Sequence, residues 1–467
     1  MDFKSISKKL FEVIYKKKLR TITIMTIIMV LFIVTVVATD AFGVFSWWQE
    51  LSVRESRPVY ELLEEGYGDK LNLTAIDEDI KITVESILAD DIKTVILLEI
   101  EDLKQKDLYG TTRDGIEFEG SLEYDADIPE ELHGANYSLL TLHSEDPFRR
   151  RLLINLQPLT EKESTLFLNI KELESNLVDS DKVVEGNWSF EIPVSVYDVA
   201  TYDINKELEV EGNILTLETL TIGPTSTLLT YNFQHNQTWE YTLEHFNNVQ
   251  LFSNGKEYVE RFFGGVGSSQ SQYANNRKQR TMVIREFDAM YLDKPEEIEV
   301  KVGGYGVHVK ANAYKSFDIH MDQGFPQEFE YMGSSIIIES INIGEDTTEI
   351  IIKESMEDRN YEELEIDFRT EGNAFVYPVQ DWQEYYIVDS DGAKVEGNQD
   401  NYFYYTMNMK NPTIYTTKSL ITLKHSPGRE NLPLEVRGPD EIVPSALVIR
   451  GYRENRIAEE SIKIELE

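Results

Sequence analysis

The chain has 467 residues, a formal net charge of −39 and no cysteine. The excess of 84 acidic over 45 basic residues repels nucleic acid and so excludes a general nucleic-acid-binding protein. The absence of cysteine excludes a disulfide scaffold and thiolate metal centres, and the apolar content of 41% excludes a chain disordered throughout.

The first predicted element is an apolar stretch at residues 21–39, TITIMTIIMVLFIVTVVAT, which contains no charge, proline or glycine. At about 1.5 Å per residue, a helix of this length roughly matches a ~30 Å hydrocarbon core, so the stretch predicts a transmembrane helix. A fully buried core helix and a cleaved signal peptide are the alternatives. The second is disfavoured because the run is long and only Val36-Val37-Ala38 offers small residues for cleavage.

Charges on the two sides of this stretch predict its orientation. Most of the charges in residues 1–20 are basic, whereas Asp40, Trp47 and Trp48 follow the stretch. Basic residues stay on the cytoplasmic side and indole rings favour the headgroup zone. We therefore expect a single-pass protein of the cell membrane, with a short cytoplasmic tail and all later domains extracellular. An outside chain without cysteine suits a bacterial surface protein.

Residues 40–68 are interpreted as a juxtamembrane connector with one short helix. The sequence SRPVYELLEEGYG places Ser56 near the N-cap, Pro58 in the first turn and Gly66 at the stop. Its apolar residues lie on one side, so we expect this helix to pack on the first outer domain: Val59, Leu62 and Leu63.

From Asp69 onward, short runs rich in Ile, Val, Thr, Tyr and Phe alternate with charged residues and end at Gly, Asn or Asp. This pattern predicts a mainly β chain with three tandem immunoglobulin-like β-sandwiches. The predicted domains are a family-like first sandwich and two further immunoglobulin-like sandwiches, at residues 69–198, 206–314 and 326–467. The linkers near 196–205 and 314–326 are short, which favours a semi-rigid rod.

A repeated pattern supports three related units. The sequences ITVES at 82–86, LTLET at 215–219 and IIIES at 336–340 are each followed by Thr nine residues after the Glu. Similar strand composition is one explanation, but the shared interval and the domain-sized spacing favour a triplication. We expect each copy to form two neighbouring strands with its glutamate on an equivalent outward position: Glu85, Glu218 and Glu339. The run VILLEI at 95–100 predicts a central strand.

The segment at residues 60–103, which includes ITVESILADDIKT, resembles the start of domain-of-unknown-function family 4179. The resemblance covers roughly residues 47–196, and the sequence GNILTLETLTIGPTSTLL resembles the immunoglobulin-like domains that often follow. It implies a membrane-anchored protein of Gram-positive bacteria, often encoded beside an extracytoplasmic-function sigma factor, and offers no catalytic residues. The cytoplasmic part is too short, and lacks the cysteines, for a zinc-type anti-sigma domain.

The sequence offers no recognisable catalytic, cofactor or metal motif. No two of the seven histidines stand at i, i+4, and His235 and His245 are interpreted as ordinary loop or strand residues. The glycine-rich run at 264–267 lacks the Lys-Ser/Thr of a phosphate loop. Asp389 to Gly392 resembles a calcium loop but reads as an Asp-Gly hairpin, which leaves weak Ca²⁺ binding open.

These observations predict a non-catalytic membrane protein without cofactors, whose acidic outer domains sense or regulate the envelope in a sigma-factor system. The alternative is a passive structural or adhesive stalk that binds a wall or protein partner. A surface hydrolase is a third hypothesis, and the missing motifs disfavour it.

Overall fold

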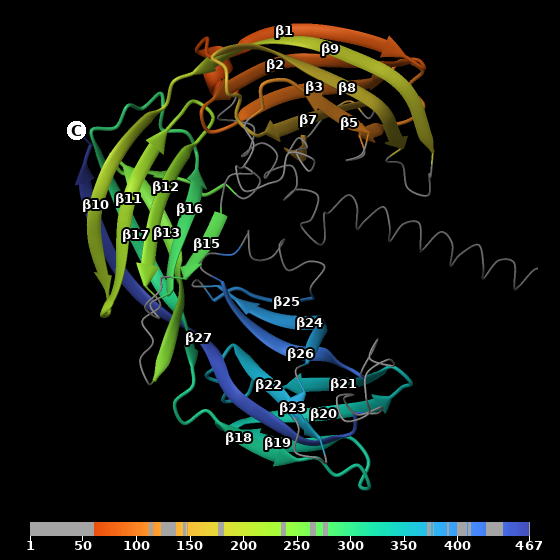
Figure 1. The fold of residues 1–467 in the computed structure, drawn as a ribbon, viewed down its shortest axis with the longest axis vertical. Helices are drawn as coiled ribbons and strands as arrows, with labels where there is room; N and C mark the ends of the chain where they lie inside the picture. The colour runs from red at the N-terminus through yellow and green to blue at the C-terminus, as the bar shows by residue number, and fades with distance from the viewer. Residues whose placement is uncertain are drawn as a thin grey trace, which may run out of the picture.

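The computed structural model describes residues 60–111, 115–122, 137–142, 146, 148–175, 182–234, 240–261, 268–273, 279–370, 375–376, 378–389, 392–398, 409, 412–425 and 442–466. The prediction of a mainly β chain is confirmed, and the strands form three layered units in an open curve (Figure 1). Within these ranges no helix is both long and apolar enough to cross a bilayer. The predicted span at 21–39 lies outside them.

The first unit contains nine strands in the order β4-β8-β9-β2-β3-β7-β6, with β1 on β2 and β5 on β8. Its strands are β1 (Asp69–Asp77), β2 (Ile80–Asp90), β3 (Thr94–Asp102), β4 (Tyr109–Thr111), β5 (Ile116–Glu119), β6 (Tyr137–Leu142), β7 (Arg149–Leu156), β8 (Glu163–Ser175) and β9 (Val183–Tyr197). Strands β2 and β9 join through only two parallel pairs, so two layers enclose one core. Trp188 is fully buried there and its indole donates to the Ile80 carbonyl at 3.0 Å.

The predicted connector helix is described at residues 60–64. It ends at Gly66, whose φ of +90° and backbone bonds place it at the left-handed position of a helix stop. Leu63 packs on the outer face of β3, against Val95 and Leu97. As predicted for a central strand, β3 lies between β2 and β7 and is buried on both faces.

The second unit begins with a five-stranded sheet in the order β10-β11-β12-β16-β15. The strands are β10 (Ala200–Val210), β11 (Asn213–Ile222), β12 (Thr227–Gln234), β15 (Ser268–Tyr273) and β16 (Gln279–Phe287). The third unit has a six-stranded sheet, β19-β20-β21-β26-β24-β25. Its strands are β19 (Gln327–Tyr331), β20 (Ser334–Ile343), β21 (Thr347–Glu354), β24 (Val379–Val388), β25 (Lys394–Asn398) and β26 (Thr413–Lys424).

A seven-stranded sheet, β14-β13-β17-β27-β22-β23 with β18 on β27, is shared by the second and third units. Its strands are β13 (Tyr241–Ser253), β14 (Lys256–Tyr258), β17 (Glu297–Val309), β18 (Lys315–Asp318), β22 (Glu363–Thr370), β23 (Phe375–Val376) and β27 (Pro444–Glu465). The last of these runs through both units (Figure 1). Its Leu447 and Ile449 belong to the third core, whereas Ala458 and Ile464 belong to the second.

This shared strand corrects the predicted assignment of residues 326–467 to one domain. The part of β27 from Tyr452 to Glu465 pairs with β17 and completes the second sandwich. The reason is physical: β17 would otherwise be an open edge with unpaired N–H and C=O groups, which a strand from later in the chain satisfies.

The triple repeat is confirmed at the level of strand pairing. The three copies form the hairpins β2-β3, β11-β12 and β20-β21, each preceded by one antiparallel strand and followed across the sheet by another. In every hairpin the register shifts at the glutamate, so Glu85, Glu218 and Glu339 are each skipped by the partner strand. Such a bulge turns its extra residue outward and changes which residues face the core.

Each outward glutamate meets a cation of its own sheet, on the second strand over for Glu85 and Glu218 and on the adjacent strand for Glu339. Glu85 contacts Arg151 at 2.7 Å, Glu218 contacts Arg280 at 2.9 Å, and Glu339 contacts Lys353 at 2.5 Å. The threonines nine residues later are fully buried in all three copies: Thr94, Thr227 and Thr348. The nine-residue interval found in the sequence therefore separates a glutamate in a surface ion pair from a buried threonine near the start of the next strand.

Candidate functional site

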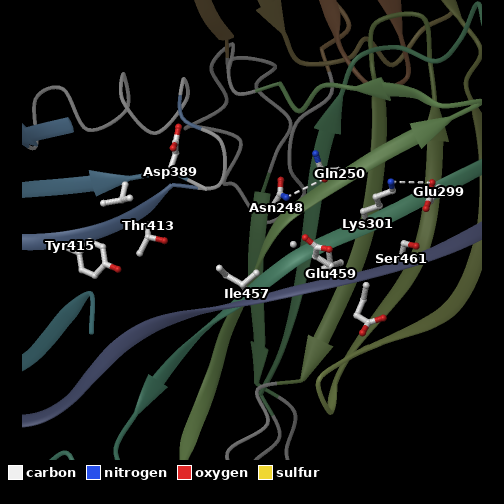
Figure 2. A pocket seen from close by; sticks show the side chains of 14 residues that line it. Asn248, Gln250, Glu299, Lys301, Asp389, Thr413, Tyr415, Ile457, Glu459 and Ser461 are labelled. Carbon is white, nitrogen blue, oxygen red and sulfur yellow. Dashed lines mark hydrogen bonds and ion pairs between the residues drawn. The ribbon is translucent and has the colours of Figure 1, made fainter. Parts of the chain in front are cut away.

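A groove of about 850 Å³ lies where the second and third units meet. Its floor comes from β13, β17 and β27, and its opposite wall comes from the ends of β24 and β26 (Figure 2). The volume is within the range of ligand-binding clefts. Because both walls come from different units, the groove exists only when these units are held together.

The floor is the solvent-facing side of the shared sheet. Asn248 and Gln250 of β13 lie beside Lys301 of β17, and Ser461 of β27 is the strand partner of Lys301. Gly303 fits here because a Cβ would lie 2.5 Å from the Asn248 amide nitrogen. The floor is therefore lined by polar side chains, and Gly303 adds no side chain to it.

One apolar side chain breaks this polar surface. Ile457 of β27 is 84% exposed and lines the groove (Figure 2). It lies at a register irregularity. Ile457 pairs with Gly304 and Glu460 pairs with Val302, so β27 has one more residue than β17 between these two pairs. The bulge buries Ala458 and leaves Ile457 outward. Val388 and Tyr415 give the facing wall further apolar surface.

The groove is acidic. Among the lining residues that the structure describes, four carry carboxylates, Glu299, Asp389, Glu459 and Glu460, and one, Lys301, carries a cation. The Lys301 ammonium lies 3.8 Å from Glu299 and 4.5 Å from the centre of the Phe252 ring, so it is already engaged. The remaining negative potential favours a ligand that carries positive charge.

The two units are fixed to each other beside the groove by Glu362. Its carboxylate accepts hydrogen bonds from the backbone N and side-chain Nδ2 of Asn455, at 2.7 and 2.8 Å. Asn455 in turn accepts a bond of 2.5 Å from Asn247 of β13. The carbonyl of Glu362 accepts from the backbone of Thr416, next to Tyr415 in the groove wall.

Burial raises the pKa of Glu362 from 4.5 to about 7, against the opposing effects of Asn455 and Arg359, and nearby Glu454 raises the pKa further. Because the folded pKa lies above the unfolded value, this carboxyl stabilises the fold most below about pH 4.5. Its contribution is lost as the pH rises to about 7.

We therefore predict that Glu362→Gln gains stability relative to the wild type as the pH rises from 4.5 to 8, by about 1–2 kcal/mol. The measurement is amide hydrogen exchange of β22 and β27 in both chains at the two pH values. Glu363→Gln serves as a control because its carboxylate pairs with Arg453 at the surface. A Glu362→Gln difference independent of pH contradicts the prediction.

The residues considered as sites in the sequence fall in different places. Asp389 lines the groove, and its carboxylate accepts from the Ala393 backbone at 2.7 Å within the predicted hairpin turn. His245 lies in β13, where burial lowers its pKa, and packs under Gly306, as expected of an ordinary strand residue. His235 and residues 264–267 lie outside the described residues. Within the described ranges, no three His, Cys, Asp or Glu converge on a metal position.

Comparison with known proteins bears on the first unit. Residues 15–102 match the family model described as "Domain of unknown function (DUF4179)". The resemblance to this family is thereby confirmed, although the match begins before the resemblance stated from the sequence and ends with β3. The DUF4179 match thus includes the predicted membrane span and the first copy of the repeat.

No curated protein matches the chain. Among solved structures, the chain is similar to "the crystal structure of the conserved domain protein from Bacillus anthracis", with 16% identity and a TM-score of 0.37. That similarity covers 55% of this chain and 83% of the other, and at this score it carries no functional argument.

Proposed function

We propose that this chain is a non-catalytic, single-pass protein of the cell membrane whose extracytoplasmic β units bind a protein partner in the groove. The DUF4179 match supports the envelope setting, because the resemblance implies membrane-anchored proteins linked to sigma-factor systems. The proposal keeps the immunoglobulin-like assignment of the units. The regulatory output of the protein is transcriptional, and the passive stalk is the competing function.

The observation that carries this proposal is the exposed Ile457 on the polar floor of an acidic groove. Burying one such side chain is worth about 1.5–3 kcal/mol, and a bulge is a common device for aiming a side chain at a partner. The surrounding carboxylates suit a partner segment that carries lysine or arginine beside an apolar residue. A stalk that only spaces other domains has no need of this arrangement.

The test compares transcript profiles of a deletion strain complemented with the wild type, Ile457→Asp or Ile76→Asp. Ile76 of β1 is a matched control because it is 63% exposed on the first unit, away from the groove. We expect Ile457→Asp to give the deletion profile and Ile76→Asp to restore the wild-type one. If the deletion itself changes no transcripts, the stalk function replaces the proposal.

The membrane orientation is a separate prediction. The basic residues before 21–39 predict that the N-terminus is cytoplasmic and the C-terminus external. Protease treatment of intact cells should digest the β units and leave a short membrane-bound fragment. A C-terminal tag protected in intact cells, but cleaved after permeabilisation, would reverse this orientation.

A further inference from the structure

The first and second units meet at equivalent turns of the repeat. The β2-β3 turn is closed by a backbone bond from Asp90 to Lys93 at 3.1 Å, and the β11-β12 turn by one from Gly223 to Ser226 at 2.9 Å. The buried Asp90 carboxylate accepts from the backbone N and the hydroxyl of Thr225, at 2.7 and 2.9 Å. Gly223 is required because a Cβ there would lie 2.4 Å from Asp90 Oδ2.

Lys93 extends from this turn into the second unit. Its Nζ contacts Oε1 of Glu286 on β16, and the side chains of both residues are only 1% exposed. Asp90 and Arg261 act electrostatically on Lys93, and Arg261 also donates to the Thr225 carbonyl at 3.2 Å. An amine and a carboxyl group from distant parts of the chain thus touch in a site closed to water.

The carboxylate of Glu286 is incompletely satisfied. Its Oε2 is buried and has no hydrogen-bond partner among the described residues. A buried ion pair is stable only when additional donors satisfy its remaining lone pairs, and an orphaned charged oxygen is costly. A neutral amide would fit this site better, because it carries no charge and retains a single acceptor oxygen.

We propose that Lys93 and Glu286 are joined by an isopeptide bond between Nζ and Cδ. Proton transfer within the contact converts the ammonium and carboxylate into an amine and a carboxylic acid. The amine lone pair forms the Nζ–Cδ bond, the Cδ–OH bond breaks, and one Nζ proton leaves with the hydroxyl as water. The reaction needs no oxidant, reductant or activated co-substrate.

The surroundings favour each step. Burial lowers the pKa of Lys93, which increases the fraction of reactive amine. Asp90 acts electrostatically on Lys93, and the four hydrogen bonds that its carboxylate accepts from Ile92, Lys93 and Thr225 hold the two turns together beside the reacting pair. Exclusion of water disfavours the reverse hydrolysis. The product fixes the first unit to the second covalently.

The test is the intact mass of the purified full-length wild-type chain. We expect it to lie below the sequence mass by one water, about 18 Da. Trypsin should then release residues 82–104 and 286–301 as one branched peptide, with cleavage blocked at Lys93. A wild-type chain at its full sequence mass, with both peptides linear, overturns the proposal, and no variant is needed for this result.

Variants identify the bond. Lys93→Arg and Glu286→Ala should restore the full mass, whereas Glu286→Gln should lose ammonia, about 17 Da, and yield the wild-type product. Lys463→Arg is the matched control, because Lys463 contacts Glu297 at 3.0 Å in a solvent-exposed pair. It should keep the loss of water. Loss of water that persists in Lys93→Arg would assign the mass change elsewhere and contradict the proposal.

Discussion

Replacing Ile96 with alanine should lower the free energy of unfolding of the first unit by about 2–5 kcal/mol. Ile96 lies in β3, is fully buried, and packs in the core that holds Trp188. The helical segment at 60–64 covers the other face of β3, so the sheet has little freedom to close the cavity. The measurement is amide hydrogen exchange of β2 and β3 in the full chain.

Ile76→Ala provides the matched control for this prediction. It removes the same atoms from β1 of the same unit, but its side chain is 63% exposed. We expect a change within about 0.5 kcal/mol, as for most surface substitutions. Equal effects of the two substitutions would mean that β3 is not the centre of the first core.

Arg359→Met should cost the third unit about 3–5 kcal/mol at neutral pH, because it leaves a buried carboxylate without its cation. The Arg359 side chain is fully buried and lies 3.2 Å from the equally buried Glu354. It also donates to the carbonyls of Tyr361, Thr416 and Glu362. This one side chain therefore satisfies three backbone carbonyls beside the groove.

The pH dependence identifies the cause. Burial raises the pKa of Glu354 from 4.5 to about 7, and Arg359 opposes this shift. Without Arg359 the pKa rises further, so Glu354 is already protonated in the folded variant at pH 4.5, and the variant should recover part of its stability there. Lys463→Met, at an exposed ion pair, should cost less than about 1 kcal/mol at either pH. Melting curves of the wild type, Arg359→Met and Lys463→Met at pH 4.5 and 8 measure both effects.

Much of the β architecture could be predicted because local sequence patterns determine it. Alternating residues predicted the strand faces, and the Glu-to-Thr interval predicted three equivalent hairpins. The bulges were not predicted. A bulge changes which residues of the partner strand lie opposite, whereas the sequence of the bulged strand itself still alternates up to the glutamate. Glu85, for example, looks like an ordinary outward residue between Val84 and Ser86.

Long-range pairing explains what the sequence did not reveal. Residues in RENRIAEE show no clean alternation, because this part of β27 crosses from one unit to the next. Ile457 stands alone among polar residues in this run, so the sequence did not indicate the groove that it lines. The burial of Lys93 could not be predicted either, because it depends on Glu286, 193 positions away in the sequence. For the groove, the local signal in the sequence is one β-branched residue, Ile457, within a charged run.

The sharing of β27 has a consequence for biosynthesis. During synthesis β17 is made more than a hundred residues before the strand that pairs with it, from Glu297↔Glu465 to Val309↔Tyr452. Until β27 emerges, the second unit presents an open strand edge, which is a template for misassociation between nascent chains. Loop closure over such a distance is slow compared with hairpin formation. A ribosome-stalled chain that ends before β27 should therefore recruit chaperones through its second unit, even though most of that unit's residues are already present.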